Sequence, residues 1–514
     1  MTNKSIPVIC VVDLQTGSAR VLQGVPLDVS PGQAVWAPDS QSVFFVGWYH
    51  EPFRLGLKFC SNRRSSLFRL DLSGHCEHLS GDNLSVSCPR LSPDGSVLIY
   101  LQGEVFGPHN QCLRIQQLDL KSKKTSTLVD VVNRPQNGEF AGVYEAMPSC
   151  CWSEDGHRLV FSSACRNWKD LFMVDRRSQT VTSLSDKSSR VYGSWKLLTV
   201  QRDLMVVCCS SPNTPPTLRV GFIPSDGEAV TWRTLQHPVV TFNFLWTTLD
   251  VTPPPEDDDT RYSGLDFGAV LVKPSPLPHG TTTPLVVFIH GGPHSQFPAE
   301  WNSTTAGLVR LGFAVLMVNY RGSTGFGQDS ILSLIGQIGN QDVKDVQRAV
   351  LTALQGDKTL NPERLAVIGG SHGGFLSCHL IGQYPDFYRA CAARNPVINA
   401  ATLLGTSDIV DWRYTSAGFL FSYDGIPTAE ALAVMLEKSP ITQAAKIKAP
   451  VLLMLGGKDR RVSPHQGLEL YKVLKSRGSP VRLLWFPEDG HSLSRVDTQA
   501  DCFLNTVLWL NQHL

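Results

Sequence analysis

The most constraining feature of this sequence is an abrupt change from strand to helix within residues 365–384. Residues 365–368, LAVI, have the composition of a buried strand, and GGSHGG at residues 369–374 leads directly into a helix-compatible segment that ends before Pro385. Glycines two positions before and two positions after Ser371 let the neighbouring backbones approach closely in a tight turn. Such a turn exposes the serine hydroxyl at a helix N-terminus, and Ser371 is therefore predicted to be a nucleophile.

The pattern around this turn indicates the fold of the C-terminal half. Apolar, strand-like runs alternate with helix-compatible segments, which is typical of a mostly parallel sheet covered by helices on both faces. In such sheets, functional side chains gather at the carboxyl ends of the strands. The expected strands are residues 268–272, 285–289, 313–318, 365–368, 451–455 and 481–486.

A serine hydroxyl is a poor nucleophile unless a base removes its proton, and His491 occupies the position expected of that base. It follows the expected strand at residues 481–486 within the sequence PEDGHS. The alternatives are His372, which adjoins the serine but whose side chain should point elsewhere, and His294, which lies in an earlier loop. We therefore predict that His491 is the catalytic base.

The acid that orients this histidine should follow a third strand, and Asp459 does so in the sequence GGKD after residues 451–455. Asp408 and Asp411 are the alternatives, but they lie in a polar segment without an immediately preceding strand. The resulting chain order of serine, aspartate and histidine is the order of α/β-hydrolases, and it differs from the chymotrypsin-like and subtilisin-like orders.

A tetrahedral intermediate also needs hydrogen-bond donors for its oxyanion. The first expected donor is the backbone amide of His372, directly after the nucleophile. The second is expected from the loop HGGPHS at residues 290–295, where we assign Gly292, with Gly291 as the neighbouring alternative. His290 is either a supporting hydrogen-bond residue or a turn residue, and the sequence does not separate the two.

The N-terminal half has a different pattern. WAPDS, LSPDG and WSEDG, which begin at Trp36, Leu91 and Trp152, are each followed by a strand-like run. This imperfect repeat favours four-stranded propeller blades, with a β-sandwich or an irregular all-β domain as the alternative. The segment VTPPPEDDD after residue 250 is unsuited to helix or sheet. The expected domains are a partial β-propeller at residues 1–250, a linker at 251–263 and an α/β-hydrolase domain at 264–514.

Composition narrows the classes of partner. The chain has 514 residues, enough for two cores, and its 46 basic and 45 acidic residues leave a formal charge of +1, which provides no bulk attraction for nucleic acid or anionic lipid. No apolar run approaches the roughly 20 residues of a membrane helix. The start of the chain lacks signal-peptide features, and the thirteen cysteines lack metal-ligand spacing. We expect reduced thiols in a cytoplasmic protein.

Seven ordered motifs resemble the prolyl oligopeptidase family of serine peptidases, most closely its acylaminoacyl peptidase branch. The resemblance covers most of the chain. The motifs are HGGPHS (290–295), VNYRGSTGFG (318–327), GNQDVKDV (339–346), GGSHGGF (369–375), ARNPV (393–397), GGKDRRV (456–462) and EDGHS (488–492).

The resemblance implies a β-propeller that covers an α/β-hydrolase domain and admits short peptides. It also implies a catalytic triad of Ser371, Asp459 and His491, no cofactor and no metal. The sequence contains no adjacent pair of glutamates, which related dipeptidyl aminopeptidases use to bind a free amino terminus. The expected reaction is therefore removal of one N-acylated residue, such as N-acetylalanine, from a short peptide. Alternatives are a carboxylesterase, a broader oligopeptidase, or an inactive interaction protein.

Family members are also expected to form cytoplasmic homo-oligomers, tetramers in particular. At roughly 45 to 60 residues per blade, the residues before the linker make four or five blades, whereas the family builds seven. On this count we expect an N-terminally shortened member of the family, in which folding, oligomerisation and activity could be impaired.

Overall fold

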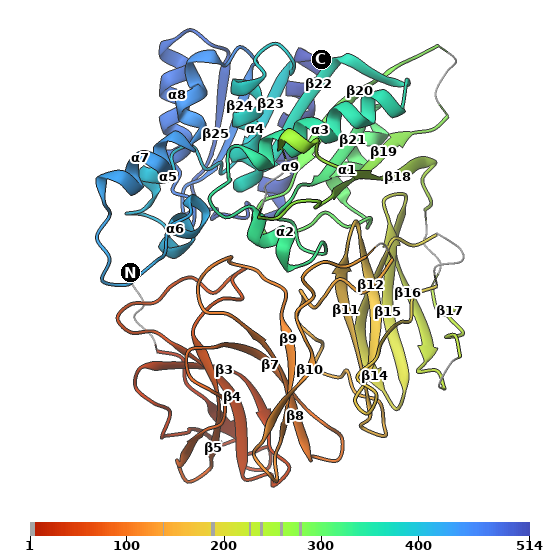
Figure 1. The fold of residues 1–514 in the computed structure, drawn as a ribbon, viewed down its shortest axis with the longest axis vertical. Coiled ribbons are helices and arrows are strands. Elements are labelled where there is room, and N and C mark those ends of the chain that lie inside the picture. Colours follow the sequence, from red (N-terminus) through yellow and green to blue (C-terminus); the bar gives the residue numbers. More distant parts are fainter. Residues whose placement is uncertain are drawn as a thin grey trace.

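The chain folds into an N-terminal part made of β-sheets and a C-terminal part in which helices cover a central sheet (Figure 1). The computed structural model describes residues 6–136, 138–186, 191–225, 228–236, 240–257, 261–276 and 280–514. The expected order of an all-β domain followed by an α/β domain is confirmed.

The N-terminal part is built from short strands that follow one another along the chain. They are β1 (Cys10–Val12), β2 (Ala19–Val21), β3 (Val29–Trp36), β4 (Ser42–Tyr49), β5 (Ser65–Asp71), β6 (Cys76–His78), β7 (Ser85–Leu91), β8 (Val97–Gly103), β9 (Arg114–Asp119), β10 (Thr125–Val129), β11 (Arg158–Cys165), β12 (Trp168–Asp175), β13 (Val181–Ser183), β14 (Ser194–Gln201), β15 (Leu204–Ser211), β16 (Thr214–Phe222) and β17 (Arg233–Thr234).

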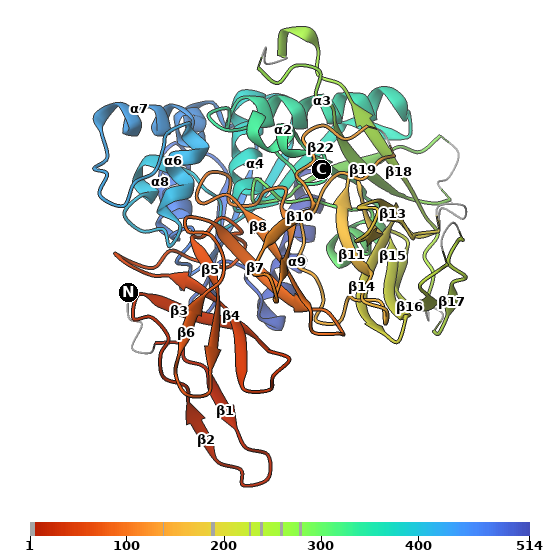
Figure 2. The same ribbon diagram turned by 60° about the horizontal axis from the view of Figure 1, so that its bottom comes forward.

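Neighbouring strands in this part pair antiparallel, as in propeller blades. Two sheets have the orders β3-β4-β5-β6 and β10-β9-β8-β7. A third sheet contains β11 to β17, and its two halves are joined by one parallel pair, Lys169 with Ser194. Each sheet packs on the next in the chain. Phe44 of β4 lies in one buried apolar cluster with Leu98 of β8, and Ile99 of β8 lies in another with Phe161 of β11. The sheets therefore succeed one another, unlike the two facing sheets of a sandwich. The hairpin of β1 and β2 projects away from the rest (Figure 2).

The C-terminal part has one large sheet and helices on both of its faces. Its strands are β18 (Phe244–Val251), β19 (Phe267–Pro274), β20 (Thr283–Ile289), β21 (Ala314–Asn319), β22 (Leu360–Gly370), β23 (Ala390–Arg394), β24 (Val451–Gly456) and β25 (Val481–Phe486). Its helices are α1 (Ser303–Arg310), α2 (Gln328–Ser333), α3 (Gln341–Gly356), α4 (His372–Gln383), α5 (Ala400–Leu403), α6 (Val410–Ala417), α7 (Ala429–Glu437), α8 (His465–Ser476) and α9 (Val496–His513), with 3₁₀ turns at Pro255–Asp257 and Pro440–Lys446.

The strand order is β18-β19-β21-β20-β22-β23-β24-β25. From β21 to β25 the neighbours are parallel, whereas β19 runs antiparallel to both β18 and β21. Alternate strand residues face opposite sides, so the sheet buries two separate cores. One core packs against α3, α4 and α8, and the other packs against α1 and α9. The carboxyl ends of the parallel strands lie along the edge that faces the N-terminal part (Figure 1).

The domain boundary that we expected at residue 250 does not match the sheets. β18 begins at Phe244 and pairs along its length with β19, from Phe244 with Pro274 to Val251 with Phe267. The segment 251–263, expected to be the interdomain linker, therefore connects two neighbouring strands of one sheet; its residues 258–260 lie outside the described residues. The two parts instead meet between β17 and β18.

Ion pairs of two buried arginines join the two parts. Arg63 Nη1 donates to Asp411 Oδ2 across 2.6 Å, and these side chains are only 5% and 0% exposed. The buried side chain of Arg166 pairs with the more exposed Asp250 and Asp266, at 2.9 and 2.7 Å. Because an ion excluded from water needs its counter-ion, these pairs fix how the N-terminal part sits on the C-terminal part.

Candidate active site

Ser371 lies in the turn between β22 and α4. Its backbone has φ 58° and ψ −119°, a left-handed conformation that costs energy for a residue with a Cβ atom. The turn leaves no room for a side chain at either flanking glycine. A Cβ on Gly369 would lie 2.4 Å from the carbonyl oxygen of Gly373, and a Cβ on Gly373 would lie 2.1 Å from the carbonyl oxygen of Ile289. The turn thus has the strained geometry of a nucleophile elbow.

His491 and Asp459 come from the loops after β25 and β24. His491 Nδ1 lies 2.6 Å from Asp459 Oδ2, and the Asp459 side chain is fully buried. The other carboxylate oxygen of Asp459 accepts hydrogen bonds from the backbone amides of Arg461, at 2.8 Å, and Val462, at 2.9 Å. These bonds fix the carboxylate, which in turn leaves Nε2 of the imidazole free to face the serine.

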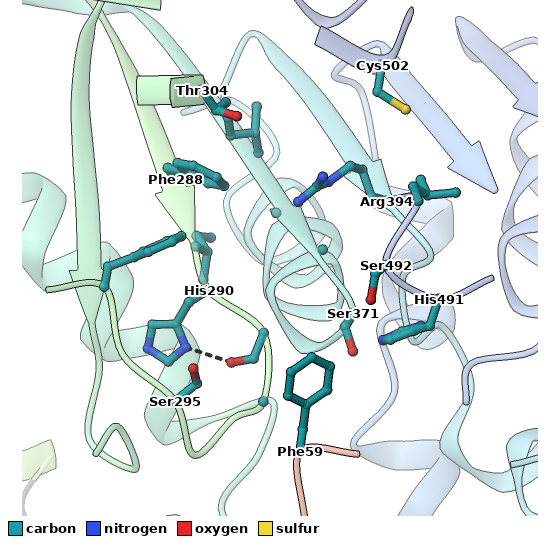
Figure 3. A pocket seen from close by; sticks show the side chains of 18 of the residues that line it. Phe59, Phe288, His290, Ser295, Thr304, Ser371, Arg394, His491, Ser492 and Cys502 are labelled. Carbon is teal, nitrogen blue, oxygen red and sulfur yellow. Dashed lines mark hydrogen bonds between the residues drawn. The ribbon is translucent and has the colours of Figure 1, made fainter. Parts of the chain in front are cut away.

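Ser371 and His491 line the same cavity. Figure 3 shows the Ser371 side chain directed toward the His491 ring. The structure therefore brings together the three residues that the sequence predicted for the triad, from three different strand ends.

Asn395, which the sequence analysis did not single out, connects the loops of the acid and the base. Its side-chain amide donates to the carbonyl oxygen of His491 at 2.8 Å, and its side-chain oxygen accepts from the amide of Gly456 at 2.8 Å. One side chain thus joins the end of β23 to the loops that hold Asp459 and His491. Its place in the ARNPV motif at residues 393–397 was the signal in the sequence.

The loop after β20 lies against the nucleophile. A Cβ on Gly291 would lie 3.3 Å from Cβ of Ser371. The carbonyl oxygen of Gly291 accepts a hydrogen bond from His290 Nδ1 at 2.7 Å. Because the peptide bond between Gly291 and Gly292 is trans, the Gly292 amide points opposite to the Gly291 carbonyl, away from the His290 ring. The amide of His372, in the first turn of α4, is the other expected oxyanion donor.

His290 itself is a hydrogen-bond residue. Burial lowers its pKa to about 3, so the ring is neutral at pH 7. Nδ1 therefore carries the proton that Gly291 accepts, and Nε2 accepts from the hydroxyl of Ser323 at 2.8 Å. Of the two interpretations that the sequence left open, the structure shows the supporting role.

The alternative candidates have other partners. His372 Nε2 lies 2.8 Å from Asp342 Oδ2, on the buried side of the turn. His294 Nδ1 bonds to the carbonyl oxygen of Gly322, and burial lowers its pKa to about 4. Asp408 pairs with Arg461, and Asp411 pairs with Arg63. Neither of these histidines pairs with Asp459, and neither of these aspartates pairs with His491.

The cavity around Ser371 has a volume of about 970 Å³ and is lined by both parts of the molecule. Phe59, Cys60, His109 and Asn110 come from the N-terminal part, and the rest of the wall comes from the C-terminal sheet, α1, α6 and α9. Among the described residues that line it, none has a carboxylate side chain. Within the part of the chain that the structure describes, no three His, Cys, Asp or Glu side chains are grouped so as to hold a metal ion. The helices of that part are also too short or too polar to span a bilayer.

An α/β sheet with a serine elbow, a histidine and an aspartate at neighbouring strand ends defines a serine hydrolase. The model of the prolyl oligopeptidase family matches residues 300–514, and the model of the N-terminal domain of acylamino-acid-releasing enzymes matches residues 1–244. The second match ends where β18 begins. The chain belongs to the prolyl oligopeptidase family of serine peptidases.

Curated acylamino-acid-releasing enzymes are similar to this chain over nearly its whole length. The acylamino-acid-releasing enzyme of Homo sapiens is 53% identical over 518 residues, which cover 100% of this chain and 70% of that protein. The acylamino-acid-releasing enzyme of Arabidopsis thaliana is 34% identical and covers 99% of this chain and 72% of its own length.

Solved structures share the fold at low identity. A puromycin-hydrolyzing peptidase of Mycobacterium tuberculosis has a TM-score of 0.71 at 21% identity, covering 97% of this chain and 71% of its own. An acylaminoacyl peptidase of Pyrococcus horikoshii has a TM-score of 0.64 at 18% identity, covering 99% and 84%. These structures support the combination of an N-terminal β domain and a C-terminal α/β-hydrolase domain.

Proposed function

We propose that the protein removes an N-acylated amino acid, such as N-acetylalanine, from the amino end of short peptides. The observation that carries the proposal is the cavity at Ser371, whose described lining offers no carboxylate to a free amino terminus. A peptide ammonium buried there would lack a counter-ion, whereas an amide-blocked amino end carries no charge to desolvate. The similarity to acylamino-acid-releasing enzymes supports the same substrate class.

In the proposed mechanism His491 removes the proton of the Ser371 hydroxyl, and the serine oxygen attacks the carbonyl carbon of the acylated residue. Asp459 holds the imidazole in the required tautomer and stabilises the imidazolium. The amides of His372 and Gly292 donate to the oxyanion. His491 then protonates the departing amine, the C–N bond breaks, and the acyl-enzyme ester remains on Ser371.

The second half of the reaction repeats these steps with water. His491 takes a proton from the water, whose oxygen attacks the ester carbonyl, and then returns a proton to Ser371 as the ester bond breaks. The products are the shortened peptide and the free N-acyl amino acid, whose new carboxylate forms beside Ser371.

The test is release of N-acetylalanine from an N-acetylalanyl peptide. The unacetylated peptide and an ester of the same acyl group serve as comparison substrates, and Ser371→Ala serves as the inactive control, with circular dichroism to verify its fold. We expect turnover that requires both the acetyl group and Ser371. Equal turnover of the free-amino peptide, or activity that survives Ser371→Ala, would contradict the proposal.

We also propose a cytoplasmic location and a homo-oligomeric state, as the family resemblance implies. The structure describes all thirteen cysteines and joins none of them in a disulfide, as is usual in a reducing compartment. Cell fractionation tests the location, and light scattering coupled to gel filtration tests the oligomeric state. A monomer at micromolar concentration, or a membrane-bound fraction, would argue against these assignments.

A further inference from the structure

Arg394 places a cation directly behind the nucleophile. It is the last residue of β23, and its carbonyl oxygen accepts the backbone amide of Ser371 at 2.9 Å. The alternation of β23 puts its side chain on the same face as Ala392 and Ala390, which is the face covered by α1 and α9. A Cβ on Gly370 would lie 3.6 Å from Nη2 of this guanidinium. The charge is therefore next to the residue that precedes Ser371.

The side chain of Arg394 extends into the same cavity as Ser371. Figure 3 shows its guanidinium pointing across this pocket, toward the side where Phe288 and Thr304 lie. The ring of Phe288 and the thiol of Cys502 belong to the same wall. The cation thus borders space that a ligand of the active site can occupy.

Within the described part of the chain, the Arg394 guanidinium has neither an ion pair nor a hydrogen bond. Three buried arginines, Arg63, Arg166 and Arg321, each pair with an aspartate at 2.6 to 2.9 Å. Arg413 of α6 is buried without an ion pair to any described residue, but it does not line the cavity. Burial lowers the pKa of Arg394, which shows that the surroundings disfavour its charge. A desolvated cation without a counter-ion is costly, and a ligand anion would offset that cost.

The cavity as a whole suits an anion. No described residue of its lining has a carboxylate, and its other cation, Arg461, already pairs with Asp408 at 3.1 Å. His290 and His294 are neutral at pH 7 because burial lowers their pKa values to about 3 and about 4. Arg394 is therefore the cation of this lining that is left to bind a negative group.

We propose that Arg394 is an anion-recognition residue that binds a ligand carboxylate in the pocket behind Ser371. The inference rests on the proposed function and specifies which substrates and products the site favours. A carboxylate reaches this position from two sources: an acidic side chain on the acylated residue of the substrate, or the carboxylate of the N-acyl amino acid that hydrolysis releases. Either group accepts the two parallel N–H bonds that a guanidinium offers.

The first experiment separates the substrate source. The kcat/KM of an N-acetylglutamyl peptide is compared with that of the N-acetylglutaminyl peptide of otherwise identical sequence, in the wild type, Arg394→Met and Arg394→Lys. A charge-assisted contact predicts that the wild type favours the glutamyl peptide by about tenfold or more, since such bonds contribute about 1.5–3 kcal/mol. Arg394→Met should abolish the preference for the glutamyl over the glutaminyl peptide, whatever turnover the two peptides share, while Arg394→Lys should retain part of the preference.

The second experiment separates the product source and needs no turnover. Calorimetry measures the Kd of N-acetylalanine and of uncharged N-acetylalaninamide. Preference of the wild type for the carboxylate by about tenfold, lost in Arg394→Met, assigns the product carboxylate to Arg394. Arg389→Met is the matched control, because Arg389 lies just before β23 but is half exposed and pairs with Glu363; it should behave as the wild type does.

The outcomes separate this inference from the proposed function. Failure to cleave any N-acetylated peptide would overturn the proposed function, while the calorimetric comparison would still report on Arg394. Cleavage of the N-acetylalanyl peptide with no Arg394-dependent preference in either experiment would overturn the role of Arg394 and leave the proposed function standing. If Arg394→Met unfolds, Arg394→Gln and the two ligand pairs on the wild type decide the question in the same way.

Discussion

Removal of the His290 side chain tests whether the oxyanion donor is held in place by one hydrogen bond. The 2.7 Å bond from Nδ1 to the carbonyl oxygen of Gly291 fixes the peptide unit whose other end is the Gly292 amide. In His290→Ala that peptide is free to rotate, and the amide is no longer aimed at the oxyanion. Loss of one such donor costs about 2.7–4 kcal/mol in the transition state, which corresponds to a fall in kcat of about 10² to 10³.

The assay is steady-state hydrolysis of the N-acetylalanyl peptide, with kcat and KM determined separately, and thermal unfolding to verify the fold. KM should change little, because the donor acts on a charge that develops after binding. Ser323→Ala is the matched control: it removes the hydroxyl at Nε2 but leaves the bond to Gly291, and it should reduce kcat by less than about tenfold. A folded His290→Ala enzyme with kcat within about fivefold of the wild type would refute the reasoning.

Three further predictions follow from contacts around the site. Asp459→Asn should reduce kcat by about 10⁴ with little change in KM, because His491 loses its tautomer; a loss below about a hundredfold would argue against this acid. Gly373→Ala should lower the free energy of unfolding by more than about 2 kcal/mol, since its Cβ would meet the carbonyl oxygen of Ile289, while Gly405→Ala, with open space around it, should change little in urea titrations. The free energy of unfolding should also fall as the pH is lowered from 6.5 to about 4, because histidines in the unfolded chain bind protons that buried neutral histidines do not. The expected fall is about 1.4 kcal/mol per pH unit for each such histidine. Equal urea midpoints at pH 7.5 and 5 would contradict this. The histidines are His290, His294 and His379.

The sequence predicted the strands that precede its recognisable loops, and it missed two others. β18 has no apolar run before a glycine-rich loop, and the prolines and acids that follow it suggested a linker. β23, with the sequence ACAAR, has little intrinsic strand propensity, and its place between β22 and β24 is decided by packing. Local pattern is informative where a strand is long and rich in branched side chains, and it fails where neighbours impose the conformation.

The same distinction applies to the site. Ser371, Asp459 and His491 follow strand ends in a known order, so their positions could be predicted. The contacts of His290 and Asn395 depend on which loops meet in space, and no spacing along the chain encodes that. Arg394 belongs to the ARNPV motif, which contributed to the family resemblance. The sequence does not show whether its guanidinium has a partner, because that depends on which side chains surround it in the folded cavity.

The buried pair of Arg63 and Asp411 has a consequence for dissecting the molecule. Asp411 belongs to α6, one of the helices that line the active-site cavity, yet its cation comes from the opposite part of the chain. An isolated C-terminal fragment would expose this carboxylate and lose the wall formed by Phe59 and His109. The C-terminal part alone therefore does not form the complete active-site pocket. Inhibitor screens and engineered fusions need both parts, because residues of both form its wall.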